Sequence, residues 1–172
     1  MNSYKVSLVR AANAFIRNVQ VVLSWISKKR LPPFCSVLAL IEKDGQVFVI
    51  NHLVHKVYSF PGGYVQIGEA PTDAIIREMI EETGIKVRPI RIVGCYKNKI
   101  GMHSINIIYL CEIQSDGDAV CYEGRCGWMD ARQVYDLMPT HCQDAMNDYM
   151  SSKQLIAEDQ RWGGVGQNHS RW

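Results

Sequence analysis

The chain has 172 residues, which is enough for one domain with a substantial hydrophobic core and does not require a second domain. Its 19 basic and 17 acidic residues nearly cancel, so the overall charge gives no reason to expect a stable complex with nucleic acid. The six cysteines show neither paired CxxC spacing nor the pattern of a small secreted domain. We therefore expect reduced, mostly buried thiols in a cytoplasmic protein.

Residues 1–30 form a basic leader, with six Lys or Arg residues and no acidic residue. Apolar residues recur there in steps of three and four, which predicts an amphipathic helix whose apolar face carries Leu8, Ala12, Phe15, Val19, Val22 and Ile26. The longest uncharged run, residues 18–27, is much shorter than the roughly 20 residues that cross a bilayer. The leader ends in Lys28-Lys29-Arg30 and not in the small residues of a secretory cleavage site.

Three interpretations of residues 1–30 remain open at this point. The helix packs on the domain or on a second copy in a homodimer, or it makes a peripheral contact with an anionic membrane, or it is a targeting segment that an organelle removes. A membrane-associated or organellar location therefore stands beside the cytoplasmic one. Pro32 and Pro33 end the helix and mark the start of a domain that we expect to span residues 31–155.

Short apolar runs at residues 34–41, 46–50 and 57–60 predict three strands. Asp44 and Gly45 separate the first two runs and are typical of a tight turn, so we expect these strands to pair as a hairpin. The third strand leads into Gly62 and Gly63. His55 lies on the connection before it and is a candidate for a contact with a phosphate or a base, although a solvated loop is the simpler interpretation.

A helix is predicted from Pro71 to Thr83, because proline suits a first turn and Gly84 suits the position after the end. At about 100° per residue, one face of this helix is apolar and the other carries Glu78, Glu81 and Glu82. Glutamates at these spacings repel one another by a few tenths of a kcal/mol per pair. A hard divalent cation such as Mg²⁺ or Mn²⁺ would offset this repulsion, since it prefers carboxylate oxygen.

The surrounding residues strengthen the metal interpretation. Every fixed position of the Nudix box is matched, by Gly63, Glu69, Arg77, Glu78, Met79, Glu81, Glu82, Gly84 and Ile85. The chain therefore resembles the Nudix hydrolases, which cleave the pyrophosphate of a nucleoside diphosphate linked to another moiety. The resemblance implies an α/β fold, the Nudix α/β/α sandwich with a mixed β-sheet, here preceded by the amphipathic helix.

The resemblance also implies roles for the acidic residues of the box. The glutamates that match Glu78, Glu81 and Glu82 hold the metal, which we expect to be Mg²⁺ or Mn²⁺. The arginine that matches Arg77 orients these glutamates by ion pairing, and the loop glutamate that matches Glu69 supports the site.

Substrate contacts and the proton acceptor are further expectations. Gly62 and Gly63 match glycines that let the backbone turn tightly beside the metal, where it can approach the substrate. Two or more cations would bridge the phosphates and activate a water, whose proton a carboxylate would take. Glu78 is our first candidate for that carboxylate, with Glu69 and Glu123 as alternatives. Glu123, in EGRCGWM, resembles a glutamate that precedes a tryptophan in the MutT-like branch, with a gap of one residue in the match.

After the box, residues 87–96 and 104–113 predict two strands, and the apolar character of the second favours a central place in the sheet. Lys97 belongs to a polar, basic turn between them that could reach substrate phosphates. Residues 120–129 read as a loop, followed by a helix beginning near Asp130 and another at residues 141–152. Residues 156–172 are expected to be a loose C-terminal tail.

No motif names the substrate. The box together with Glu123 favours a nucleoside triphosphate or a nucleotide sugar as the small-molecule nucleotide substrate. One alternative is an RNA 5′-end pyrophosphohydrolase. Another is a non-catalytic module that senses a nucleotide, but such a module would be expected to lose box glutamates, and this chain keeps all of them.

Overall fold

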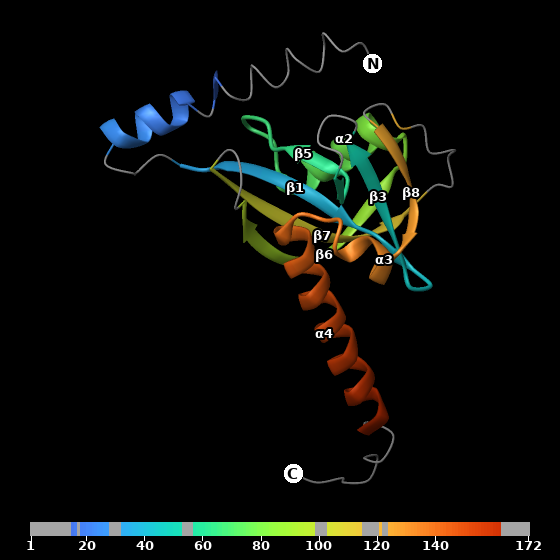
Figure 1. Ribbon diagram of the computed structural model, residues 1–172. Coiled ribbons are helices and arrows are strands. Elements are labelled where there is room, and N and C mark those ends of the chain that lie inside the picture. Colours follow the sequence, from blue (N-terminus) through green and yellow to red (C-terminus); the bar gives the residue numbers. More distant parts are fainter. Residues whose placement is uncertain are drawn as a thin grey trace, which may run out of the picture.

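The computed structural model describes residues 15–16, 18–27, 32–52, 57–98, 103–114, 121 and 124–162. In these ranges a mixed four-stranded sheet lies between helical layers, and a second small sheet closes one side (Figure 1). This arrangement confirms the predicted α/β fold. No helix in the described ranges is long and apolar enough to cross a membrane.

The main sheet has the strand order β5-β1-β7-β6. Strands β1 and β7 are parallel, and each pairs with its outer neighbour in antiparallel fashion. The four strands are β1 (Phe34–Leu40), β5 (Gly62–Tyr64), β6 (Val87–Lys97) and β7 (Ser104–Ile113). β7 occupies a central place, as its nearly uninterrupted apolar sequence predicted.

The apolar run of β1 is continuous because both faces of this strand are buried. Val37 and Ala39 point to one face, where they pack with Ile75 and Met79 of the helix α2 (Pro71–Thr83). On the other face Leu38 and Leu40 belong to a second apolar cluster, which includes side chains of the helices α3 (Ala131–Tyr135) and α4 (Thr140–Trp162). The alternation along one strand therefore joins the two helical layers to the sheet.

The second sheet corrects two predictions. It contains β2 (Glu42–Lys43), β3 (Gln46–His52), β4 (Tyr58–Ser59) and β8 (Gly124–Asp130). The predicted hairpin forms only between β2 and β3, around left-handed Asp44 and Gly45, whereas β1 belongs to the main sheet. The expected loop at residues 120–129 is a strand from Gly124 onward, because its backbone pairs with the whole of β3.

The helices agree with their predicted starts more closely than with their ends. α2 has the predicted limits, and Gly84 closes it in a left-handed conformation with its N–H bonded to Ile80 O at 2.9 Å. Asp130 caps α3 by accepting hydrogen bonds from two backbone N–H groups, at 2.9 and 3.1 Å. α4 continues to Trp162, so the prediction of a helix ending at Ser152 and a loose tail from residue 156 is wrong as far as residue 162.

Glu42 attaches α4 to the second sheet. Its Oε2 accepts hydrogen bonds from the Tyr149 hydroxyl and the Lys153 ammonium group, both at 2.9 Å. Its Oε1 accepts the backbone N–H of Gly45 at 3.0 Å. One carboxylate therefore joins the β2–β3 turn to the middle of a helix more than a hundred residues later in the chain.

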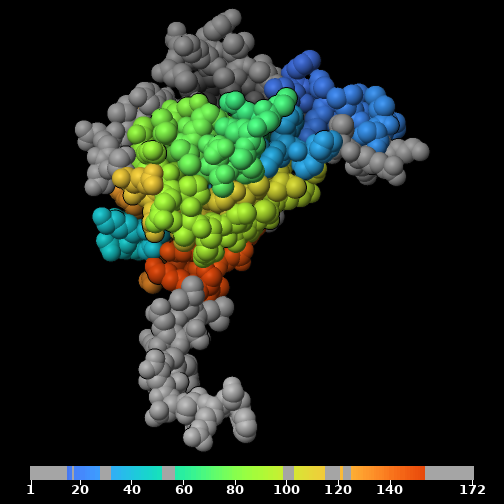
Figure 2. Space-filling model, turned by 180° about the vertical axis from the view of Figure 1, so that it is seen from behind, coloured from blue at the N-terminus to red at the C-terminus, as the bar shows by residue number. Residues whose placement is uncertain are grey.

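The N-terminal helix is described at residues 15–16 and 18–26, and we call this part the leader helix. It projects from the body of the molecule in both views (Figures 1 and 2). Its predicted apolar face is exposed to solvent at Phe15, Val22 and Ile26. Packing of this face on the domain, one of the interpretations left open, is therefore wrong for these residues.

The cysteines partly follow the prediction of reduced, mostly buried thiols. The Cα atoms of Cys121 and Cys126 lie 5.8 Å apart, a separation that a disulfide bridges, and Cys95 is exposed. Cys111 and Cys142 are buried free thiols, and burial raises the pKa of each to about 12. These two thiols are therefore unreactive packing residues.

Candidate active site

Arg77, in the middle of α2, is the centre of the candidate site. Its guanidinium group donates to the carboxylates of three glutamates and to one backbone carbonyl. The side chain is mostly buried, with 22% of its surface exposed. Hydrogen bonds to Glu69 in the first place, and then to Glu78 and Glu81, raise the pKa of Arg77, so it stays charged.

Glu69 pairs with Arg77 through both of its carboxylate oxygens. Nε donates to Oε1 at 2.7 Å and Nη2 donates to Oε2 at 2.9 Å, which is the two-point geometry that suits a planar guanidinium group. The backbone N–H of Gln66 also donates to Oε2, at 2.9 Å. The hydrogen bond from Arg77, and then that from Gln66, lowers the pKa of Glu69 to about 2. The loop before α2 is thereby fixed to the helix.

The same guanidinium group reaches two glutamates of its own helix. Nη1 donates to Glu78 Oε1 at 2.8 Å and to Glu81 Oε2 at 3.0 Å. The Glu78 side chain is 14% exposed, whereas that of Glu81 is 57% exposed. Glu78 is therefore held within the site, and Glu81 has room to turn at its edge.

Glu82 is tied to the backbone of β5. The residue is only 6% exposed, and its Oε2 accepts the N–H of Gly62 at 2.8 Å. Gly62 has φ +143°, and a Cβ atom there would collide with the backbone of Val37 on β1. Only glycine fits this close approach, which brings the last turn of α2 next to the first residue of β5.

Gly63 is the second close approach. A Cβ atom at this position would lie 2.5 Å from the carboxylate atoms of Glu78. The missing side chain of Gly63 therefore creates the space that the Glu78 carboxylate fills. Tyr64 follows directly, and its carbonyl oxygen accepts Arg77 Nη2 at 3.0 Å. Sequence reasoning missed this contact, because a backbone acceptor carries no signal in the residue type.

These residues fit a divalent cation in the chemistry of their donors. Glu78, Glu81 and Glu82 supply hard carboxylate oxygens from one side of a single helix, next to the two glycines of β5. In the described part of the chain, however, no three acidic, histidine or cysteine side chains converge closely enough to hold a metal as they stand. Arg77 Nη1 holds two of the three glutamates, Glu78 and Glu81, and Glu81 is the exposed one of this pair.

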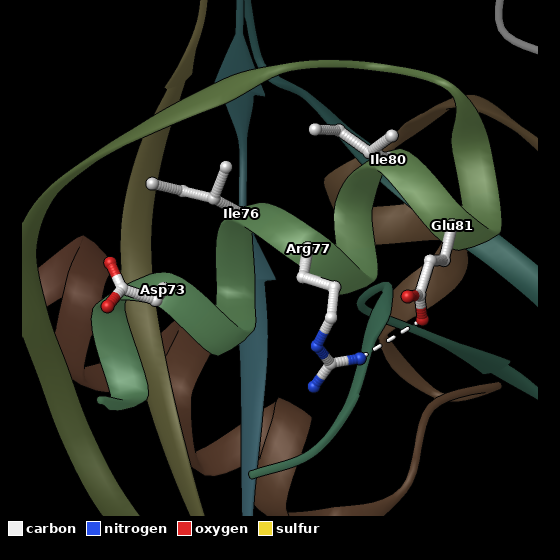
Figure 3. A pocket seen from close by; sticks show the side chains of 5 residues that line it. All are labelled: Asp73, Ile76, Arg77, Ile80 and Glu81. Carbon is white, nitrogen blue, oxygen red and sulfur yellow. Dashed lines mark hydrogen bonds and ion pairs between the residues drawn. The ribbon is translucent and has the colours of Figure 1, made fainter. Parts of the chain in front are cut away.

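A shallow hollow of about 400 Å³ lies along the outer side of α2 (Figure 3). Arg77 and Glu81 border it on the side of the carboxylate cluster, and the other lining residues are Asp73, Ile76 and Ile80. The helical spacing of these five residues puts them on one face. The face therefore offers an apolar floor directly beside charged groups.

The structure brings most of the predicted site residues together. Glu69, Arg77, Glu78 and Glu81 share one ion-pair network, and Glu82 with Gly62 and Gly63 lies beside it. Lys97 lies elsewhere, because it ends β6, which is the edge strand opposite β5 in the sheet. At about 4.8 Å per strand this separation is roughly 14 Å between backbones. His55 and Glu123 lie outside the described residues.

Comparison with known proteins identifies the family of this chain. The model of the NUDIX domain family matches residues 31–147. Over 142 residues the chain is 26% identical to the NAD-capped RNA hydrolase NudC of Pasteurella multocida (strain Pm70), covering 78% of the chain and 53% of that protein. Over 90 residues it is 31% identical to an ADP-ribose pyrophosphatase of Methanocaldococcus jannaschii, covering 48% of the chain and 53% of that protein. The matches thus span about half the length of these curated relatives.

Solved structures agree on the fold. A MutT protein from Methanosarcina mazei Go1 superposes with a TM-score of 0.64 at 22% identity, over 72% of this chain and 97% of that one. A NUDIX hydrolase from Nitrosomonas europaea gives a TM-score of 0.63 at 23% identity, over 71% of this chain and 91% of that one. At these identities the likeness concerns the arrangement of strands and helices.

Proposed function

This chain belongs to the NUDIX domain family, and on that premise we propose that it hydrolyses the pyrophosphate bond of a nucleoside diphosphate linked to another moiety, with a divalent cation. The observation that carries the proposal is the cluster of Glu69, Arg77, Glu78 and Glu81 beside the glycines of β5. A protein that used the fold only for packing would have no need to bring these like-charged side chains together.

Glu78, Glu81 and Glu82 would hold the cation, which we propose to be Mg²⁺ or Mn²⁺. When bound, the cation supplies positive charge that polarises the phosphate oxygens and acidifies the attacking water. Arg77 keeps the carboxylates of Glu78 and Glu81 in place through its hydrogen bonds, and Gly62 and Gly63 let the backbone of β5 pass close to Val37 and to the Glu78 carboxylate. The ion pair between Arg77 and the loop residue Glu69 in turn fixes the position of the Arg77 guanidinium group.

Glu78 is the better candidate for taking the proton of the water. A general base works best when its pKa is close to the working pH, and the pKa of Glu69 is lowered to about 2 by Arg77. Both oxygens of Glu69 are also bound in the two-point pair. These two features support Glu69 as a positioning residue, with Glu78 as the base and Glu123 as a further candidate outside the described residues.

For the substrate we propose a nucleoside triphosphate or a nucleotide sugar first. RNA carrying a 5′ pyrophosphate linkage is the second candidate, supported by the similarity to a protein named NAD-capped RNA hydrolase over most of this chain. The ADP-ribose pyrophosphatase relative adds ADP-ribose to the compounds that need testing. All of them share a pyrophosphate attached to a nucleoside.

The decisive experiment is turnover of a panel of these compounds with Mg²⁺ or Mn²⁺, with the products identified. We expect a nucleoside monophosphate from a nucleotide sugar or a triphosphate, and loss of turnover on chelation. Glu78→Gln and Glu82→Gln remove one charge with little change in shape, and each should lower kcat by about a hundredfold or more. Glu112→Gln, which changes an exposed glutamate of β7 outside the cluster, is the matched control and should leave kcat unchanged.

Two results would contradict the proposal. Near-normal kcat in both box variants would remove these glutamates from the site. Tight binding of a panel compound without any turnover would instead favour a nucleotide-sensing module.

A further inference from the structure

The leader helix exposes apolar side chains around most of its circumference. Trp25 is 83% exposed, Ile26 74% and Phe15 69%, and further apolar residues with large exposed surfaces are Ile16, Val21, Val22 and Leu23. Leaving this many apolar groups in water is unfavourable, since burial of apolar surface is what stabilises folded and associated states. A surface of this kind marks a contact with a protein or a lipid.

The helix is attached to the domain by polar contacts. The Gln20 side chain donates from Nε2 to the His103 carbonyl and accepts the His103 N–H at Oε1, each at 3.0 Å. His103 directly precedes β7, and its carbonyl also accepts the N–H of Phe34 at the start of β1. This two-bond clamp fixes the helix at one end of the main sheet without covering its apolar residues (Figure 1).

The end of the sheet beside the clamp carries two exposed aromatic side chains and one exposed lysine. Phe34 is 41% exposed and packs edge-on against Tyr64, which is 44% exposed. Lys97 ends β6 at the same end, since it pairs with Ile105 and this residue in turn pairs with Cys35. Phe34, Tyr64 and Lys97 therefore lie at the end of the sheet to which the clamp attaches the helix.

The charge of the leader distinguishes a second copy of this chain from a lipid surface as the partner. The leader carries Lys5, Arg10, Arg17, Lys28, Lys29 and Arg30, and the first acidic residue of the chain is Glu42. A second copy of the chain would bring an equally basic segment to the contact, so the two would repel each other. An anionic lipid surface offers the opposite charge and attracts each Lys or Arg that lies near it.

We propose that the leader helix lies on an anionic membrane surface. Phe15, Trp25 and Ile26 enter the boundary between headgroups and acyl chains, and the basic residues of the leader sequence supply the attraction to anionic headgroups. Through the Gln20–His103 clamp, the end of the sheet with Phe34 and Tyr64 faces the same surface.

Co-sedimentation of the full chain with vesicles tests this proposal without any substrate, so its outcome is independent of the proposed function. We expect binding to vesicles of phosphatidylcholine with phosphatidylserine, and at least about tenfold weaker binding to phosphatidylcholine alone. Raising the salt from about 0.1 M to about 1 M shortens the Debye length from about 10 Å to about 3 Å and should release the protein.

Two variants separate the apolar from the electrostatic contribution. Trp25→Glu changes an exposed residue and should weaken binding at least about tenfold with the fold retained. Met150→Glu is its matched control, because it also replaces an exposed apolar residue of a helix, on α4, and binding should not change. Replacing Lys28, Lys29 and Arg30 together by Gln should weaken binding to anionic vesicles at least about tenfold.

Three outcomes would overturn the proposal. Equal binding to neutral vesicles, or binding that salt does not weaken, would remove the role of the basic residues. A dimer that ignores vesicles and dissociates in Trp25→Glu, measured by light scattering, would assign the helix to a second copy. A monomer that binds no vesicle would rule out both contacts.

Discussion

Arg77 and Glu69 form a two-point ion pair across the junction between a loop and a helix, with Nε–Oε1 2.7 Å and Nη2–Oε2 2.9 Å. The pair leaves Nη1 pointing at Glu78 and Glu81, so one side chain both anchors the loop and holds the proposed metal ligands. We therefore expect the proposed activity to depend on the shape of the guanidinium group as well as on its charge.

Arg77→Lys should lower kcat by about ten- to a hundredfold, because an ammonium group keeps the charge but cannot bind three carboxylates in fixed directions. Steady-state kinetics on the substrate found by the panel would measure the effect. Arg88→Lys is the control, since Arg88 pairs with a single glutamate and both side chains are about 60% exposed. Equal kcat values for the two variants would show that the fork geometry of Arg77 is unimportant.

Gly63→Ala should lower kcat at least about tenfold and leave the stability almost unchanged. The new Cβ would lie 2.5 Å from the Glu78 carboxylate, which is the flexible end of a side chain and can move away from its position in the site. Kinetics and thermal unfolding of the same variant separate the two effects. Gly127→Ala adds the same methyl group on β8, where nothing lies within 4 Å, and should be neutral in both measurements.

The Glu69 pair should make acid stability depend on pH in a defined window. The pKa of Glu69 is about 2 in the folded protein, below the ordinary value of about 4.3 for a glutamate. The unfolded chain therefore binds the proton more readily, so the pair stabilises the fold above about pH 4.3 and loses this effect as the pH falls toward 2. The Tm difference between the natural chain and Glu69→Gln should be largest above that window and shrink within it. A difference that does not change with pH would contradict the pairing.

Glu42→Ala should destabilise the protein by about 1–3 kcal/mol, because it removes the acceptor that Tyr149, Lys153 and Gly45 share. Denaturant unfolding measures this free energy. Glu112→Ala removes a surface ion pair with Arg88 and should cost no more than about 1 kcal/mol. If the two variants lose the same stability, the attachment of α4 through Glu42 contributes nothing beyond a surface pair.

Local sequence determined the helix of the candidate site. Pro71 and Gly84 set the limits of α2, and the helical period separated its apolar face from its glutamates before any tertiary contact was known. The spacing of the box also identified Gly63 and Glu69, which precede this helix, as residues of the site. These features depend on propensities and capping groups within a few residues of each other, so they are readable from the chain alone.

Tertiary structure decided everything that depends on a distant partner. β1 and β3 read as one hairpin, yet they belong to different sheets, because β1 pairs with β7 about seventy residues later. Residues 124–130 form a strand only because β3 offers a complete edge for pairing. Lys97 is separated from the box by the strand order, and the apolar face of the leader helix is exposed because Gln20 holds it by polar bonds at the end of the sheet. Strand pairing is set by hydrogen bonds between residues far apart in the sequence, so a local pattern indicates that a strand forms but not which neighbour it takes.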